Sequence, residues 1–131
     1  PYCPALKSSL ADAARSLGQT VGEGVYVCAE GPHLESPAQI RMMRQFGDVV
    51  GMTGYPEVAL AREAALCYAS LCIVTNPAAG MAGGGNLTVS EIADLMKKYQ
   101  MTVEEIVTLA AQTITDQRSC SCRDALKCAR F

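Results

Sequence analysis

The sequence lacks three features that would each define a class of function. It has no surplus of positive charge, because 11 lysines and arginines face 13 acidic residues, so we expect no nucleic-acid partner. Its apolar stretches are short and broken by glycine, proline or charge, so we expect no membrane partner. No cationic segment followed by an apolar one opens the chain, so we expect no signal peptide. With 50% hydrophobic and 18% charged residues, the 131 residues are instead typical of one folded domain.

Histidine is nearly absent, which argues against a metal site even though cysteine is frequent. The single histidine, His33, is far in sequence from the tail, where Cys120, Cys122 and Cys128 leave a structural zinc site one ligand short. Seven scattered cysteines are also unlike a secreted disulfide framework. We therefore expect a reduced, cytoplasmic protein, and a strained local disulfide in its tail is compatible with this expectation. Three cysteines in apolar segments are predicted to be small buried side chains: Cys28, Cys67 and Cys72.

Helical and strand patterns alternate along the chain. Ser36, Pro37 and Gln39 have the pattern of a capping box, and Thr102 with Glu105 repeats it further on. Short apolar or β-branched runs between the helices predict strands. This alternation predicts an α/β fold with a largely parallel or mixed sheet flanked by helices. The expected helices cover about residues 4–17, 36–46, 56–66, 88–98 and 102–115, and the expected strands cover 25–29, 48–52 and 68–75.

Polar or glycine- and proline-rich segments follow directly after each expected strand. They cover residues 30–36, 51–57 and 75–80. In α/β sheets, ligands bind beyond the strand ends, where such loops converge. These segments therefore predict a site for a small polar molecule.

The same segments resemble a known family. The motifs that carry the resemblance are Glu30-Gly31-Pro32, Glu35-Ser36, Val50-Gly51-Met52-Thr53, Pro56-Glu57 and Val74-Thr75-Asn76. In order and spacing they are similar to the trimeric purine nucleoside phosphorylase and methylthioadenosine phosphorylase family, over about residues 1–116. The family's enzymes are longer, and residues 1–131 look like the C-terminal half of one single-domain phosphorylase fold, with a cysteine-containing tail at about 117–131. The resemblance implies a homotrimer that also contains the companion N-terminal half.

The resemblance implies a phosphorolytic reaction, in which phosphate attacks the anomeric carbon of the ribose while the purine leaves. Inorganic phosphate is then the co-substrate, and we expect no cofactor. In the family, a glycine-rich loop and an Arg-His pair bind phosphate, and both belong to the N-terminal half. The glycine run at 83–85 lacks a following lysine and serine or threonine, so it is no substitute. We therefore expect residues 1–131 alone to be inactive.

Three side chains match family positions around the phosphate, the ribose and the base. Thr53 matches a residue whose hydroxyl and backbone N–H donate to phosphate, although a threonine serves equally well in a turn after a strand. Met52 matches the residue that flanks the ribose, with ordinary core packing as the alternative. Leu34 matches an apolar residue on the purine face, where leucine offers dispersion but no stacking.

Glu35 and Asn76 match the positions that select the base. A carboxylate only accepts hydrogen bonds, which suits the N1–H of a 6-oxopurine, and an amide can span O6 and N7. Adenine-specific members have acidic residues where this chain has Asn76 and Ala78, so hypoxanthine or guanine is favoured over adenine. Because a donor at N7 strengthens as the glycosidic bond breaks, Asn76 is the predicted catalytic residue. A solvated loop carboxylate and a turn residue before Pro77 are the structural alternatives.

Two apolar residues match the 5′ end of the ribose. Trimeric purine nucleoside phosphorylases place a histidine there, whereas Val89 and Ile92 at this helix start suit a methylthio group. The buried face of an amphipathic helix is the alternative. The only histidine, His33, is expected to support the base loop rather than to act as a general acid.

Together these residues predict a phosphorylase of 6-oxopurine nucleosides in purine salvage. The first choice of nucleoside is 5′-methylthioinosine, and inosine or guanosine is the second. A methylthioadenosine phosphorylase with relaxed base preference and an inactive nucleoside-binding fragment are the alternatives.

Overall fold

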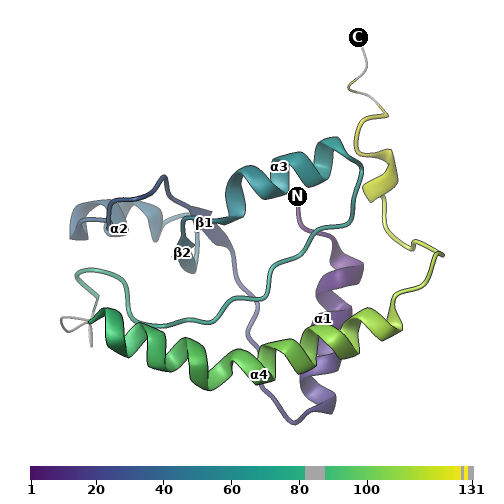
Figure 1. The fold of residues 1–131 in the computed structure, drawn as a ribbon. Helices are drawn as coiled ribbons and strands as arrows, with labels where there is room; N and C mark the ends of the chain where they lie inside the picture. The colour runs from purple at the N-terminus through teal and green to yellow at the C-terminus, as the bar shows by residue number, and fades with distance from the viewer. Residues whose placement is uncertain (82–87, 128, 130–131) are drawn as a thin grey trace. The chain divides into compact units, whose positions relative to one another are not determined.

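The computed structural model describes residues 1–81, 88–127 and 129, which fold into two compact units (Figure 1). The glycine run at 83–85 and Cys128 lie outside the described residues. No helix in the described ranges combines the length and the apolar content that a membrane span needs. Unit 1 comprises Pro1–Gly22, Tyr55–Leu71 and Thr102–Phe131, and unit 2 comprises Glu23–Gly54 and Cys72–Met101.

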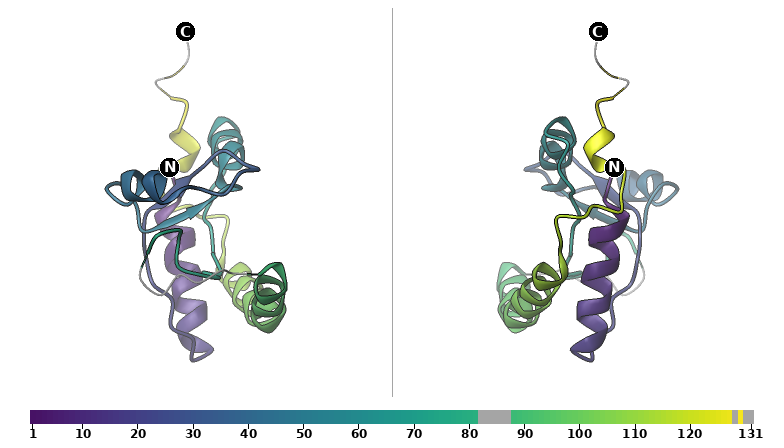
Figure 2. Two further views of the ribbon diagram at one scale, coloured as in Figure 1. Left: turned by 90° about the vertical axis from the view of Figure 1, so that its left-hand side faces the viewer. Right: turned by 90° about the vertical axis from the view of Figure 1, so that its right-hand side faces the viewer.

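Unit 1 is built around two helices. Helix α1 (Pro4–Ser16) packs against the second half of helix α4 (Val89–Thr113), and Figure 2 shows both helices from two further sides. Small side chains at the contact let the two backbones approach closely. Most of helix α3 (Gly54–Glu63) and the short 3₁₀ helix η1 (Cys122–Asp124) also belong to this unit. The buried residues between α1 and α4 are Ala13, Ala14, Ile106 and Ala110.

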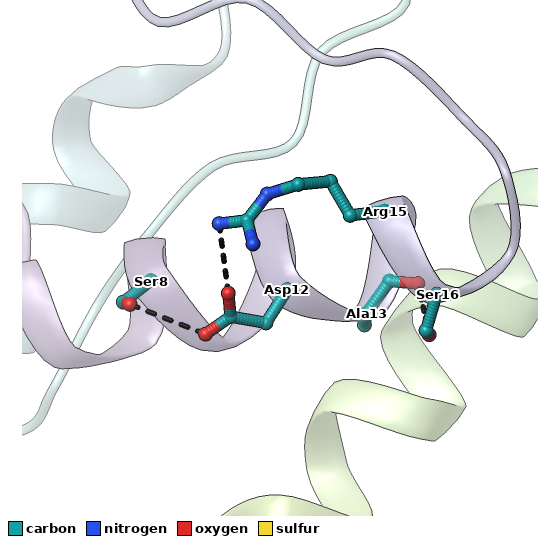
Figure 3. Close-up of polar contacts among 5 residues, drawn as sticks. All are labelled: Ser8, Asp12, Ala13, Arg15 and Ser16. Carbon is teal, nitrogen blue, oxygen red and sulfur yellow. Dashed lines mark hydrogen bonds and ion pairs between the residues drawn. The ribbon is translucent and has the colours of Figure 1, made fainter.

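The exposed face of α1 is polar (Figure 3). Asp12 accepts a hydrogen bond from Ser8 Oγ at 3.4 Å and pairs with Arg15 at 2.8 Å. In the last turn, Ser16 Oγ donates to the carbonyl oxygen of Ala13 at 2.8 Å. Because such exposed pairs contribute little to stability, the buried alanine face is what holds α1 in place.

Unit 2 contains a β-α-β element. Strands β1 (Tyr26–Cys28) and β2 (Val49–Gly51) pair in parallel, and helix α2 (Pro37–Met43) connects them. Ser36 Oγ accepts from the N–H of Gln39 at 3.3 Å, and Gln39 Oε1 accepts from the N–H of Ser36 at 2.8 Å. This is the predicted capping box, and it fixes where α2 begins.

The α/β class is confirmed, but the elements differ from the expected ones in two places. The sheet in the described residues has two strands rather than the three expected, and they are parallel, with Val27 opposite Val50. Residues 68–75 have no ladder partner there, and a strand forms only where a neighbour supplies hydrogen bonds. The expected helices at 88–98 and 102–115 are one helix, α4, because residues 99–101 contain no glycine or proline to end the first.

Candidate functional site

The loops that follow β1 and β2 lie against each other. At the end of β1 the backbone N–H of Ala29 donates to the carbonyl oxygen of Gly51 at 2.8 Å, which continues the ladder. Beyond it, the half-buried Met52 covers Gly31 so closely that a Cβ at Gly31 would lie 3.0 Å from the Met52 sulfur. The predicted ribose residue therefore packs on the loop that carries the predicted base residues.

A third segment reaches this region at the start of α2. Gly80 has a φ of +76°, and a Cβ there would lie 2.8 Å from Cβ of Pro37. Further along the segment, Met81 Sδ lies 4.0 Å from Nη1 of Arg44. The loop after residue 75 therefore runs along α2, whose first turn begins two residues after Glu35. The structure thus brings together all three segments that follow the expected strands.

Glu35 has the one buried side-chain oxygen without a partner in the described part of the chain. Its Oε1 is shielded from solvent and accepts no hydrogen bond from the described residues. An unpaired buried acceptor costs about 1–3 kcal/mol, and a charged one costs more. A ligand that donates an N–H to this oxygen would remove the cost. Glu35 is therefore the side chain of this loop that is best prepared for a ligand.

His33 is held by the helix cap. Its Nε2 lies 3.3 Å from Nε2 of Gln39. Because Gln39 Oε1 already accepts from the N–H of Ser36, the amide nitrogen is the donor and His33 Nε2 accepts. This contact ties the loop after β1 to α2, which supports a positioning role for His33.

The side chain of Asn76 forms two hydrogen bonds within its own loop. Its Oδ1 accepts from Thr75 Oγ1 at 2.7 Å, and its Nδ2 donates to the carbonyl oxygen of Pro77 at 2.9 Å. The exposed amide keeps one N–H for a ligand. In this conformation Asn76 can therefore donate one bond rather than span two purine atoms.

Thr53 forms a hydrogen bond with a residue that was not among the predicted site residues. The backbone N–H of Thr53 donates to Tyr26 Oη at 3.3 Å, and the Tyr26 hydroxyl also contacts the position that a Cβ would take at Gly51. The Thr53 side chain is exposed. The hydroxyl is therefore available to an anion, whereas the N–H would first have to leave Tyr26.

The remaining predicted residues are apolar and open to solvent. Leu34 is 85% exposed and Val89 is 84% exposed, while Ile92 is half-buried. Val89 is therefore not part of a buried helix face. The first turn of α4 is capped locally, because the N–H and hydroxyl of Thr88 donate to Glu91, and these bonds hold the pKa of Glu91 below its usual value.

A group of four thiols, called here the thiol cluster, lies in unit 1. Its sulfurs all lie within 4.8 Å of one another, and the structure contains them as free thiols. A hydrogen bond from the backbone of Cys122 and another from Cys67 lower the pKa of Cys120 to about 7. The bond to Cys120 and burial raise the pKa of Cys67 to about 12. The members of the thiol cluster are Cys3, Cys67, Cys120 and Cys122.

The thiol cluster corrects the sequence-based interpretation of the cysteines. The tail was expected to be one ligand short of a structural zinc site, but Cys3 and Cys67 lie beside Cys120 and Cys122 and complete a set of four sulfurs. Cys67 is therefore part of this cluster and not an isolated buried side chain. Cys28 and Cys72, which were also expected to be buried, are exposed. No sequence spacing could have signalled the cluster, since Cys3 and Cys120 stand near opposite ends of the chain.

Parallel strands followed by converging polar loops are typical of α/β proteins that bind small molecules beyond the strand ends. A family model described as the phosphorylase superfamily matches residues 1–112. The chain belongs to this superfamily.

Relatives in this superfamily include nucleoside phosphorylases. A "Probable S-methyl-5'-thioinosine phosphorylase" from Methanosarcina acetivorans is 50% identical over 125 residues, which is 95% of this chain and 48% of that protein. A 6-oxopurine nucleoside phosphorylase from Pyrococcus furiosus is 49% identical over 129 residues, or 97% of this chain and 48% of that protein. Methylthioadenosine phosphorylase from Schistosoma mansoni in complex with adenine matches with a TM-score of 0.81 at 26% identity, over 97% of this chain and 51% of that one. The chain spans about half the length of the curated relatives it matches.

Proposed function

We propose that this chain is the C-terminal, nucleoside-binding part of an enzyme that cleaves 6-oxopurine nucleosides with inorganic phosphate. The observation that carries the proposal is the buried, unpaired Oε1 of Glu35. The N1–H of hypoxanthine or guanine would donate to this oxygen, whereas N1 of adenine is itself an acceptor. Relatives named S-methyl-5'-thioinosine phosphorylase and 6-oxopurine nucleoside phosphorylase support the same class of base.

In this proposal Asn76 provides the catalytic donor. As the C1′–N9 bond breaks, negative charge builds up at N7 and O6 of the leaving purine. The remaining N–H of Asn76 would donate to that charge, so the hydrogen bond is stronger in the transition state than in the ground state. Leu34 would cover the face of the purine, Met52 would flank the ribose, and the Thr53 hydroxyl would bind phosphate.

The preferred nucleoside in this proposal is 5′-methylthioinosine, ahead of inosine or guanosine. Val89 and Ile92 offer no hydrogen-bond partner to a 5′-hydroxyl, and both suit a methylthio group. The complete enzyme would be a cytoplasmic homotrimer of purine salvage, with the other phosphate ligands in its N-terminal half. Residues 1–131 would form one domain with that half, would need no cofactor, and would not turn over substrate alone.

A methylthioadenosine phosphorylase with relaxed base preference is the second candidate. The solved structure from Schistosoma mansoni favours it, because that protein is in complex with adenine. In that case the 6-amino group of adenine would be the donor to Glu35. The two candidates differ in the group that donates to Glu35 Oε1, which is the N1–H of a 6-oxopurine in the first and the 6-amino group of adenine in the second.

A substrate panel on the full-length enzyme separates these candidates. With inosine, methylthioinosine, adenosine and methylthioadenosine as substrates, we expect kcat/KM to favour the 6-oxopurine nucleosides by about 100-fold or more. Glu35→Gln should lower kcat/KM for these nucleosides by about 10- to 150-fold, the equivalent of about 1.5–3 kcal/mol, and should leave the phosphate KM unchanged. The matched control is Glu63→Gln, an exposed carboxylate of α3, which should change neither parameter. Efficient cleavage of methylthioadenosine by the wild type would contradict the 6-oxopurine assignment.

A further inference from the structure

The thiol cluster is assembled from three segments of unit 1 that are distant in sequence. Cys3 directly precedes α1, and Cys67 follows α3. The other two sulfurs come from the tail, where Cys120 lies just before η1 and Cys122 begins it. The tail passes beside the end of α3 (Figure 1). The thiol cluster therefore brings together the start of the chain, its middle and its tail.

The spacing of the four sulfurs fits one tetrahedral ion. Zinc bound by four thiolates at about 2.3 Å holds the sulfurs about 3.8 Å apart. In the thiol cluster the sulfurs of Cys67 and Cys120 are 3.4 Å apart, and no pair is separated by more than 4.8 Å. A disulfide needs a sulfur–sulfur distance of about 2.0 Å, which the Cys67–Cys120 pair exceeds. Small movements of side chains would place all four sulfurs around a single ion.

The backbone segments that carry the thiols are already fixed to one another. Cys3 is fully buried, and its N–H donates to the carbonyl oxygen of Tyr68 at 2.7 Å. Arg118 Nη1 donates to the carbonyl oxygen of Ala65 at 3.0 Å, which ties the tail to the residues after α3. The rings of Tyr2 and Tyr68 stack with their centroids 5.7 Å apart. The ligand segments are thus held in place without an ion, as a preformed site requires.

We propose that the thiol cluster binds one zinc ion as a structural site. Four sulfur ligands suit zinc, and they leave no open position at which a substrate could react. Each thiol would release its proton to water when it binds the ion. The ion would fasten the tail to the start of α1 and to the segment after α3, and so stabilise unit 1. The proposal rests on unit 1 and does not depend on the base that the enzyme recognises.

The test measures metal binding by the full-length protein, purified under nitrogen with a reductant. We expect one zinc per chain by plasma mass spectrometry. After removal of the zinc, added Co²⁺ should give thiolate-to-cobalt charge-transfer absorption and the d–d bands of a tetrahedral ion, and zinc should displace it. Cys122→Ser should lose the zinc and the charge-transfer absorption. The matched control is Cys72→Ser, which lies outside the cluster and should keep both.

Three outcomes would overturn the proposal. The first is wild-type protein without zinc and without the cobalt charge-transfer absorption. The second is peptide mapping that finds cluster cysteines paired as disulfides after purification with reductant. The third is a Cys122→Ser protein that binds cobalt as the wild type does. If Cys122→Ser does not fold, the metal content and the cobalt spectrum of the wild type decide the matter.

Discussion

The two units differ in how their polar groups are satisfied. In unit 1 the Tyr68 hydroxyl donates to Glu57 at 2.7 Å, and the Tyr68 carbonyl accepts from the N–H of Cys3, so these polar groups pair with each other. In unit 2 the loops keep capacity for a ligand, since Glu35 Oε1 is unpaired and the Thr53 side chain is exposed. Internally paired groups add stability, whereas unpaired ones cost stability until a ligand arrives. Under the proposed function, unit 1 therefore stabilises the fold, and unit 2 binds the nucleoside.

The largest expected effect is on the stability of unit 1. Ile106 is 3% exposed in the contact between α1 and α4, so Ile106→Ala should leave a cavity and cost about 2–5 kcal/mol of unfolding free energy. Calorimetry should show a lower Tm, while nucleoside Kd measured well below Tm should stay within about twofold, as expected for independent sites. The exposed neighbour Val107→Ala is the control. A nucleoside Kd that rises together with the loss of stability would show that unit 1 also contributes to nucleoside binding.

Elements fixed by local contacts could be predicted from the sequence. The cap of α2 is an example, because Ser36 and Gln39 satisfy each other's backbone without help from the rest of the chain. Thr102 and Glu105 have the same local pattern but lie inside α4, since a helix that is already formed continues unless a residue stops it. Local pattern thus predicts a helix start only where the preceding residues are not helical.

Features that need a distant partner could not be predicted in this way. Residues 68–75 have the composition of a strand, but a strand also needs a neighbour, and none is present in the described residues. The thiol cluster needs α1, α3 and the tail in place before Cys3 can meet Cys120. The site residues could be predicted in part. The family resemblance identified Glu35 and Asn76, but it did not predict the hydrogen bonds that the Asn76 amide forms with Thr75 and Pro77.

The next effect concerns catalysis in unit 2. Asn76→Ala removes the proposed donor to the leaving purine, and loss of one such donor lowers kcat by about 10²–10³, or about 2.7–4 kcal/mol. The Tm should not change, because the side-chain hydrogen bonds of Asn76 to the described residues stay within its own loop, at Thr75 and Pro77. Steady-state kinetics of the full-length enzyme check this, with Gln112→Ala as an exposed amide control. A rise in nucleoside KM with unchanged kcat would show that Asn76 binds substrate without acting in the transition state.

A further prediction concerns the 5′ end of the nucleoside. Burial of the methylthio group against Val89 and Ile92 should contribute about 1–2 kcal/mol, and an unpaired 5′-hydroxyl should cost about 1–3 kcal/mol. Methylthioinosine should therefore exceed inosine in kcat/KM by about 30-fold to a few thousandfold. Val89→His should reduce or invert this preference, and Val107→His on the same helix should not. Since Val89 is 84% exposed in this chain, equal rates for both nucleosides would mean that the complete enzyme leaves the pocket open.

A smaller effect is expected at the phosphate. Thr53→Ala removes a hydroxyl that would donate to an anion, so the phosphate KM should rise about 10- to 150-fold, as loss of a charge-assisted bond of about 1.5–3 kcal/mol suggests. Thr53→Ser keeps the hydroxyl and should restore the wild-type KM. An unchanged phosphate KM in Thr53→Ala would leave Thr53 as a turn residue after β2.

The smallest effect comes from the residue that competes with phosphate for the Thr53 backbone. Tyr26 Oη accepts the N–H of Thr53 at 3.3 Å, so that N–H can reach phosphate only after this bond breaks. A neutral hydrogen bond contributes about 0.5–1.5 kcal/mol, so Tyr26→Phe should free the N–H and lower the phosphate KM by about two- to tenfold. The nucleoside KM should not change, because the substitution alters no group placed at the base or the ribose. In the double variant Tyr26→Phe with Thr53→Ala, the freed N–H should offset part of the lost hydroxyl bond. If Tyr26→Phe raised the phosphate KM instead, Tyr26 would be holding the loop after β2 in its binding conformation, and the Thr53 hydroxyl alone would contact phosphate.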